Sequence, residues 1–324
     1  MSNNPRAKKI TLFFKGFAMG IADIIPGVSG GTIAFITGIY EELVATIHNF
    51  NLKFFTVLRK EGFVAAWRLY NLSFLLTLIL GIVTGFLLLA RWVTYLLENH
   101  PVLIYSFIFG LVAFSVLFVS KQIKKWNFIN LAGILIFMVI GYVITVIEPG
   151  RAPDSYWYLF FSGAIAIIAM ILPGISGSFI LILLGSYIAV LTTLNDFTQS
   201  IINRDSAVLI TSLLKLFVFV GGILVGIKIF SGILTWLFSK HKDLVLAILT
   251  GLMIGAMNKI WPWKITLSTY TNSKGEEIPL LEKSVLPQSY PGEPQIFWAM
   301  LLALAGFLFI FLIEKIAVSK KNRT

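Results

Sequence analysis

The sequence predicts an all-α polytopic membrane protein made of two inverted-topology repeats. Each repeat is a re-entrant (broken) helical hairpin followed by three transmembrane helices. Only 13% of the 324 residues are charged, against roughly 25% in soluble domains. Apolar runs long enough to cross a bilayer recur along the whole chain. A Pro-Gly-x-Ser-Gly sequence interrupts two of these runs, at residues 26–30 and 173–177.

The first repeat is expected over residues 1–147. Its hairpin, residues 10–48, has arms at about 10–25 and 32–47 that flank Pro26 and Gly27. Each arm would be ~24 Å long as a helix, less than the ~30 Å of the hydrocarbon core. We therefore favour a re-entrant hairpin over two full spans. A basic amphipathic loop at 49–71 precedes the spans at 73–97, 101–121 and 127–147.

The second repeat is expected over residues 148–324, with its hairpin at 157–195 around Pro173 and Gly174. Its spans are predicted at 209–238, 243–261 and 295–316. Residues 262–294 are polar and proline-rich, and form the only sizeable loop expected outside the membrane, on the extracytoplasmic side.

Similarity between the halves extends beyond the Pro-Gly sequences. Gly16 matches Gly163 and Gly38 matches Gly185 at a spacing of 147 residues; at a spacing of 141, the matching pairs are Gly81 with Gly222, Gly85 with Gly226, His100 with His241 and Gly110 with Gly251. Three spans separate the two hairpins, so the second half is inverted, as in many secondary transporters that bind substrate at the repeat interface. We expect the hairpins to enter from opposite faces and meet tip to tip. Small residues also serve close helix packing alone, but duplication of the break favours a binding site.

The chain carries 26 Lys and Arg against 15 Asp and Glu. In a membrane protein this excess indicates basic cytoplasmic loops and attraction to anionic membrane lipids rather than nucleic-acid binding. Placing both termini in the cytoplasm puts most basic residues on that side. The absence of cysteine excludes disulfides, thiolate metal sites and cysteine nucleophiles. No signal for the oligomeric state is visible.

The residues after each Pro-Gly suit an anionic oxygen. Unpaired N–H groups at a helix start, with hydroxyls beside them, bind phosphate or carboxylate, and the positive end of the helix dipole favours an anion. The predicted phosphate-binding residues are Ser29, Gly30, Gly31 and Thr32 in the first copy, and Ser176, Gly177 and Ser178 in the second.

Three charged residues in the apolar segments are further candidates. Asp23 lies inside the first hairpin and is the candidate for coupling to a proton or sodium gradient; capping or a fixed ion pair fits it equally well. Arg91 and Lys228 occupy similar helix faces in the two halves, and we expect them to receive an anionic head group on opposite sides. Snorkelling to the nearer interface is the alternative, above all for Arg91.

The residues from Gly20 to Thr32, together with those from Leu172 to Ser178, resemble the polyprenyl-phosphate transporter family (PopT), formerly a domain of unknown function. The resemblance covers essentially the whole chain. It implies that undecaprenyl phosphate is flipped from the outer to the inner leaflet of the bacterial cytoplasmic (inner) membrane. This recycles the lipid carrier for peptidoglycan biosynthesis. No catalytic residue is carried over, and no cofactor is implied.

Other functions need features of their own. A secondary transporter or channel for a small anion would need an enclosed polar path rather than a lateral opening. A membrane enzyme such as a lipid phosphatase would need a nucleophile or metal constellation. The histidines, His48, His100 and His241, lie at predicted span ends without such spacing. An assembly factor would need an interaction domain, for which only 262–294 could serve.

Overall fold

The computed structural model describes residues 5–25, 28–51, 53–150, 152–271 and 277–321, and these are mostly helical. The elements of the first half are α1 (Pro5–Ala22), α2 (Gly30–Ile36), α3 (Tyr40–Asn49), α4 (Lys53–Glu61), α5 (Phe63–Leu69), α6 (Leu72–Asn99), α7 (Pro101–Ser120) and α8 (Phe128–Val146). Those of the second half are α9 (Tyr156–Ile171), α10 (Gly177–Leu183), α11 (Ser186–Asn203), α12 (Ser206–Lys240), α13 (Lys242–Ala256), η1 (Met257–Ile260), β1 (Lys264–Thr271), β2 (Glu277–Ser284), η2 (Pro287–Ser289) and α14 (Ile296–Lys321).

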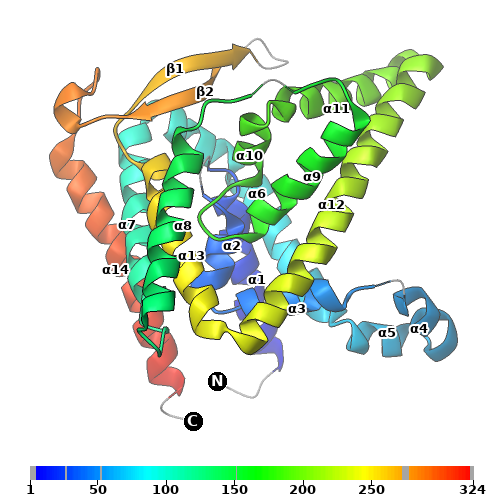
Figure 1. The fold of residues 1–324 in the computed structure, drawn as a ribbon, viewed down its shortest axis with the longest axis horizontal. Coiled ribbons are helices and arrows are strands. Elements are labelled where there is room, and N and C mark those ends of the chain that lie inside the picture. Colours follow the sequence, from blue (N-terminus) through cyan, green and yellow to red (C-terminus); the bar gives the residue numbers. More distant parts are fainter. Residues whose placement is uncertain (1–4, 26–27, 52, 151, 272–276, 322–324) are drawn as a thin grey trace.

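Several helices have the length and composition of membrane spans. Within the described ranges five qualify: α6, α7, α8, α12, and α13 continued by η1. The bent pair of α10 and α11 makes a sixth if it is counted as one span. With 35 residues, α12 is ~52 Å long, well beyond the ~30 Å hydrocarbon core, and Figure 1 shows it crossing the molecule at a slant. The chain is a helical, multi-pass membrane protein.

The two broken segments enter the molecule from opposite ends. In Figure 1, α1 comes from the end where the chain starts and finishes, and α9 comes from the end that carries β1 and β2. The breaks between α1 and α2 and between α9 and α10 lie near the middle. Pro26 and Gly27, the predicted centre of the first break, lie outside the described residues.

Each hairpin contains a second bend that the sequence reading missed. The expected continuous return arm at 32–47 is wrong, because α2 ends at Ile36 and α3 starts at Tyr40. Gly38 and its match Gly185 have φ of +73° and +68°, a left-handed conformation that ends helices and favours glycine. The axes of α10 and α11 differ by 107°. A return arm of seven residues is only ~10 Å long and cannot cross the hydrocarbon core.

Matched glycines bring helices together in the same way in both halves. In α1 and α6, a Cβ on Gly16 or Gly81 would overlap a carbonyl of the facing helix. In α9 and α12, a Cβ on Gly163 or Gly222 would do the same. Side chains at these positions would force each pair apart, so each broken segment is packed closely on one long helix.

The remaining spans pair across the two halves. A side chain on Gly110 of α7 would overlap the Ala303 carbonyl of α14, and one on Gly251 of α13 would overlap the Ile134 carbonyl of α8. Thus α7 packs on a helix of the second half and α13 on a helix of the first. This exchange ties the two halves into one bundle.

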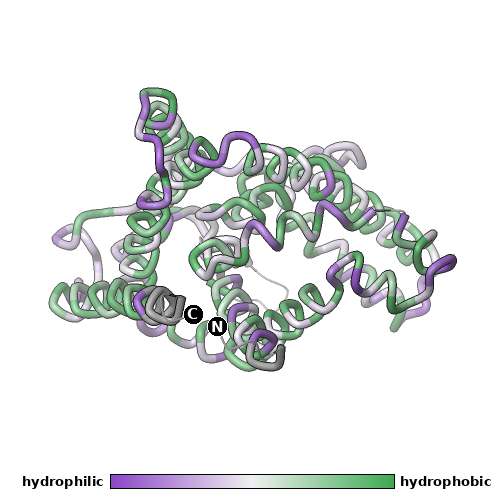
Figure 2. The backbone as a smooth tube through the Cα atoms, turned by 90° about the horizontal axis from the view of Figure 1, so that it is seen from below, coloured by the Kyte–Doolittle hydropathy of each residue, from purple (hydrophilic) through white to green (hydrophobic). Residues whose placement is uncertain are grey.

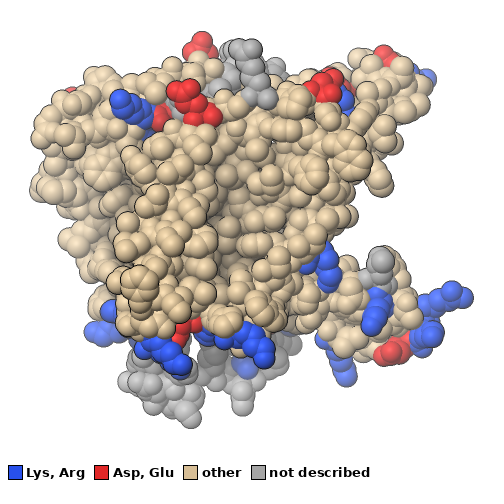
Figure 3. Space-filling model, viewed as in Figure 1, with Lys and Arg blue, Asp and Glu red and all other residues tan. Residues whose placement is uncertain are grey.

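The polar segments lie at the two ends of the bundle. In Figure 2, seen from the end that holds the termini, the helices are mostly hydrophobic, with hydrophilic stretches in the segments between them. Lys and Arg gather at this end and on the laterally projecting α4 and α5, whereas several Asp and Glu lie at the opposite end (Figures 1 and 3).

The expected loop at 262–294 contains an antiparallel β-hairpin. Lys264 pairs with Ser284 at its base, and the register shifts between Thr266 and Thr269. Two indole N–H groups fix the segment to the helices: Trp261 donates to the Val285 carbonyl and Trp263 to the Pro294 carbonyl, both at 2.8 Å. The loop is therefore an ordered cover over this end of the bundle across its described residues.

Candidate functional site: two helix breaks that meet

The two breaks contact each other through the hydroxyl residues of the first. Ser29 and Thr32 are both only 1% exposed. The Ser29 hydroxyl donates to the Met170 carbonyl at 3.0 Å, and the Gly174 N–H donates to Thr32 Oγ1 at 2.9 Å. A Cβ on Gly31 would lie 2.7 Å from the Ile171 carbonyl oxygen. The tips of the two broken segments therefore pack directly against each other.

The start of α2 already holds an anion from the protein itself. Asp23 Oδ1 accepts from the Gly30 N–H at 2.7 Å, and the Ser29 hydroxyl accepts from the Gly31 N–H at 3.1 Å. A Cβ on Gly30 would come within 2.8 Å of the Asp23 carboxylate, so glycine is needed for this approach. Asp23 therefore makes a capping contact with the Gly30 amide, one of the N–H groups that the sequence analysis assigns to an anionic ligand.

The second tip lacks this carboxylate. Met170 stands at the position that corresponds to Asp23, and its side chain is 45% exposed. The hydroxyls of Ser176 and Ser178 lie 2.8 Å apart. Within the described part of the chain, the Ser176 side chain makes no capping hydrogen bond to α10, and Gly177 is buried. The two tips are therefore chemically unequal.

Two small cavities lie beside the tips. One cavity is lined by Thr32, Gly174 and Met253 among others, and another by Gly174, Ser176 and Lys259 among others. Each has a volume of about 10 Å³, which is at most room for one water molecule. The structure thus shows the first tip closed against the second at Ser29 and Thr32, whereas the hydroxyls of Ser176 and Ser178 are exposed.

The structure places the two predicted head-group cations away from this contact. Arg91 is exposed on α6. The Lys228 ammonium donates to the carbonyls of His48 and Phe50, the latter at 3.1 Å. A cation at a helix C-terminus satisfies its last carbonyls and complements its dipole, so Lys228 stabilises the end of α3. Among the described residues, neither cation contacts a tip.

Lys15 is a polar contact of the first hairpin that the sequence reading overlooked. It is half-buried on α1, and its ammonium donates to the Thr37 carbonyl at 2.5 Å, at the end of α2. Together with Asp23 at the start of α2, it places opposite charges at the two ends where the helix dipole favours them. A lysine inside an apolar arm was the signal available in the sequence.

Three further charged residues gather above the second tip. Lys259 of η1 lies over the Phe179 ring, 4.6 Å from its centroid. Its ammonium is 3.3 Å from Glu282 Oε2, and that of Lys264 is 3.1 Å from the same oxygen. Lys264 and Glu282 both lie in the segment 262–294 that the sequence predicts as a loop. Strand pairing brings them to Lys259, a contact that the sequence does not indicate.

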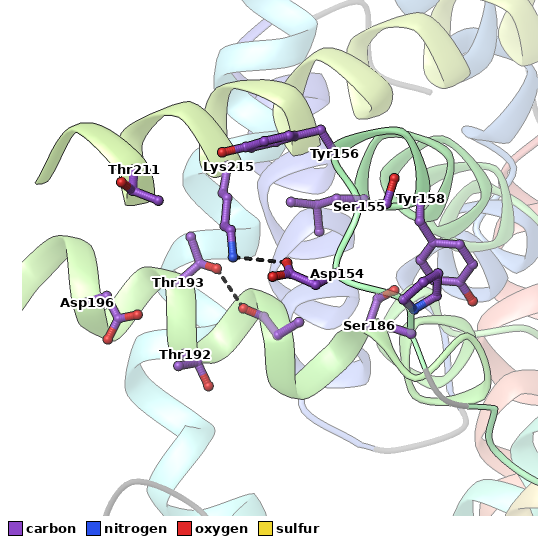
Figure 4. Close-up of a pocket in the computed structure, with 14 residues that line it drawn as sticks. Asp154, Ser155, Tyr156, Tyr158, Ser186, Thr192, Thr193, Asp196, Thr211 and Lys215 are labelled. Carbon is purple, nitrogen blue, oxygen red and sulfur yellow. Dashed lines mark hydrogen bonds and ion pairs between the residues drawn. The ribbon is translucent and has the colours of Figure 1, made fainter. Parts of the chain in front are cut away.

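A larger polar cavity, of about 500 Å³, lies between the start of α9, α11 and α12. Figure 4 shows Lys215 and Asp154 pointing toward each other across it, at 3.2 Å, with Thr193 and Asp196 nearby. The residues that line it include none from the described part of either tip.

Comparison with known proteins gives consistent matches over most of the chain. A family model described as VCA0040-like, undecaprenyl phosphate translocase-like, matches residues 19–278. A "Polyprenyl-phosphate transporter" from Vibrio cholerae serotype O1 is 41% identical over 312 residues, or 95% of this chain and 97% of the relative. One from Staphylococcus aureus is 30% identical over 266 residues, or 76% and 84%. No solved structure matches.

Proposed function

Because the chain belongs to the undecaprenyl phosphate translocase-like family, we propose that it moves undecaprenyl (polyprenyl) phosphate from the outer to the inner leaflet of the bacterial cytoplasmic membrane, as a transporter without enzymatic activity. This recycles the lipid carrier of cell-envelope synthesis. Both relatives bear the name polyprenyl-phosphate transporter. A lipid phosphate cannot cross the bilayer centre exposed, because a bare charge there is very costly.

The contact between the two tips is the observation that carries the proposal. Two broken helices that enter from opposite ends and touch through Ser29, Thr32 and Gly174 provide a single point at which access can switch between sides. In this proposal the phosphate binds where the tips part, on Ser29, Gly30, Gly31, Thr32, Ser176, Gly177 and Ser178. Arg91 and Lys228 receive the head group near the two leaflets, and the isoprenoid tail stays in lipid.

Asp23 gives the proposed cycle a means of coupling. Its carboxylate occupies the Gly30 amide that the phosphate would use. A proton or a sodium ion that neutralised Asp23 would weaken this internal bond and free the amide for substrate. Two anions cannot share one helix start, so binding of the lipid and the charged state of Asp23 exclude each other.

We also propose the inverted repeat as the basis of alternation between the sides. The matched glycines make matched helix contacts, and His100 and His241 have nearly identical backbone angles, with φ of −136° and −135° and ψ of 48° in both. The end that holds the termini carries most of the Lys and Arg in view in Figure 3, which supports a cytoplasmic location for both termini.

At the same end, α4 and α5 provide a surface for anionic membrane lipids. Phe55 and Phe63 are 64% and 61% exposed, and Arg59, Lys60 and Arg68 lie in the last turns of these helices. Exposed aromatic rings beside basic residues are typical of a helix that lies in the membrane interface. The proposed role is to hold this segment on the inner leaflet.

Reconstitution tests the function. The purified protein is placed in vesicles that contain a labelled polyprenyl phosphate, and the label in each leaflet is followed with and without a proton or sodium gradient. We expect transfer of the phosphate lipid but not of the polyprenol with the same tail. Transfer of both lipids at equal rates would contradict a phosphate site. Uptake of inorganic phosphate without lipid transfer would instead support the alternative, a small-anion transporter.

A further inference from the structure

Lys259, Lys264 and Glu282 form a buried cluster at the end of the bundle opposite the termini. Their side chains are 11%, 7% and 16% exposed, respectively. Both ammonium groups contact one oxygen, Glu282 Oε2, at 3.3 and 3.1 Å, and Lys264 also donates to the Lys259 carbonyl at 3.4 Å. One carboxylate oxygen therefore holds two cations.

The charges within this cluster do not balance. Two lysines and one glutamate leave one positive charge in a buried place, where an unpaired ion is costly. Two aromatic rings stabilise it in part: Lys264 lies 3.6 Å from the Tyr105 centroid and Lys259 lies 4.6 Å from that of Phe179. Neither ring removes the excess charge. A structural ion pair would need only one lysine.

The pKa values follow from the same arrangement. Burial lowers the pKa of Lys264, and the Glu282 charge opposes this only in part. Burial alone would raise the pKa of Glu282, but the two ammonium groups outweigh it and hold that pKa below its usual value. The glutamate is therefore ionised at neutral pH and serves as the anion of the cluster.

The cluster is adjacent to the second tip. Lys259 lines the same small cavity as Gly174, Ser176 and Phe179. Phe179 directly follows Ser178 on α10. An anion released from the lysines toward the interior would therefore meet the serine hydroxyls of the second tip next. Lys264 and Glu282 come from the β-hairpin, which covers this end of the bundle.

We propose that Lys259 and Lys264 form an outer receiving site for the phosphate monoester of the lipid, and that the Glu282 carboxylate occupies this site when substrate is absent. A phosphate monoester carries about −1.5 to −2 charges at neutral pH, so it neutralises two lysines better than one carboxylate does. The site rests on the proposed function, and it adds a step at the outer leaflet before the lipid phosphate reaches the tips.

Binding of a labelled polyprenyl phosphate to the full-length protein in lipid nanodiscs tests the site. We expect Lys259→Gln and Lys264→Gln each to weaken binding about tenfold or more, because each removes a charge-assisted hydrogen bond. Glu282→Gln should tighten binding, because it removes the competing anion. The opposite signs are diagnostic: in a purely structural cluster, all three substitutions would weaken binding, and this result would overturn the proposal.

Matched variants separate binding from folding. Lys283→Gln removes a lysine of the same strand whose side chain is exposed, and we expect it to leave affinity unchanged. Lys264→Arg keeps the charge and should restore most of the affinity lost in Lys264→Gln. Thermal unfolding of each variant is measured alongside. A Lys264→Arg variant that is as stable as the wild type yet binds as weakly as Lys264→Gln would contradict the charge-based site.

Two further binding measurements identify the ligand and distinguish failure of this inference from failure of the proposed function. Inorganic phosphate should bind far more weakly than the lipid, and equal affinity would overturn assignment to a lipid head group. Wild-type protein that bound no polyprenyl phosphate would overturn both the function and this site. Normal wild-type binding with unchanged affinity in both lysine-to-glutamine variants would overturn this site alone.

Discussion

The Thr32→Val substitution tests whether the two tips separate during transport. Valine has nearly the shape of threonine, so the change removes one hydroxyl at a position that is 1% exposed. The lost contact is the hydrogen bond from the Gly174 N–H, 2.9 Å long. No other contact between the tips involves this hydroxyl in the described structure. The perturbation is therefore confined to the closed contact.

The size of the effect on the closed state follows from the Gly174 N–H group, which loses its hydrogen-bond acceptor in Thr32→Val. A buried N–H group without a partner costs about 1–3 kcal/mol. Gly174 is only partly buried, which favours the lower half of this range, about 1–2 kcal/mol. If the Gly174 amide reaches water or substrate once the tips part, only the closed state carries this cost. The population with parted tips should then rise by roughly 5- to 30-fold.

Thiol labelling measures this population. The chain contains no cysteine, so Ser176→Cys introduces a single reporter beside the tip cavity. We expect Thr32→Val to speed its labelling by the factor given above. Thr250→Val is the matched control, because Thr250 is 2% exposed and its hydroxyl donates to the Leu246 carbonyl of its own helix. Equal labelling rates in the two backgrounds would refute a closed state held by the tip contact.

Three other substitution tests address charge and orientation. In Asp23→Asn the side chain can still accept from the Gly30 N–H but carries no charge. Transport should therefore lose its dependence on an ion gradient, while Tm stays nearly unchanged. If the dependence is retained, Asp23 serves only to cap α2 and does not couple transport to an ion. Lys228→Ala should lower transport while protein level stays normal, and unchanged flipping in reconstituted vesicles would rule out a role in transport. Cysteines that replace Lys60 and Lys320 one at a time should react with an impermeant reagent from the same side; reaction from opposite sides would refute the topology.

The positions of the helices and of both breaks followed from sequence patterns that act locally. Long apolar runs between polar segments predict spans because a helix is the form in which a single chain satisfies its backbone in lipid. A Pro-Gly pair stops such a run, because proline lacks the amide donor and glycine allows dihedrals outside the helix. These signals located α6–α8, α12, α13 and the two breaks to within a few residues. The β-hairpin was missed although residues 264–271 alternate in polarity and are rich in β-branched side chains.

The bends at Gly38 and Gly185 were harder to foresee. A glycine inside an apolar helix also serves close packing, as Gly16 and Gly81 do here. The sequence does not distinguish a glycine that is needed for its dihedral angles from one that is needed for its small size. The left-handed φ at Gly38 and Gly185 and the helix carbonyls facing Gly16 and Gly81 make the distinction. All four glycines have a match in the other half of the sequence, but this match does not show which role each glycine has.

Partners of the charged residues depend on contacts far apart in the chain. Lys228 was expected at a ligand, but its ammonium binds carbonyls of residues 48 and 50. Glu282 meets Lys259 only because β2 returns over η1. Lys259 and Lys264 differ from the exposed lysines in their burial and not in their charge. The sequence does not show which residues of a loop are buried. The expected contact between the two tips is present, whereas the sequence did not indicate the buried charges around Lys259.

Both proposed anion positions are occupied by carboxylates of the protein. Asp23 accepts from the Gly30 amide at the first tip, and Glu282 contacts Lys259 and Lys264. A carrier that returns without its anion must still pass through a closed state, and a vacant cationic site in a low-dielectric interior would be costly. An internal carboxylate lowers that cost, and on the proposals above the lipid phosphate would displace it when the carrier is loaded. On the proposals above, the same two residues would keep the empty carrier closed and make opening depend on substrate. Losing both negative charges, in a variant with Asp23→Asn and Glu282→Gln, should therefore raise lipid affinity while slowing the return of the empty carrier. Net flipping would then fall even though binding tightens.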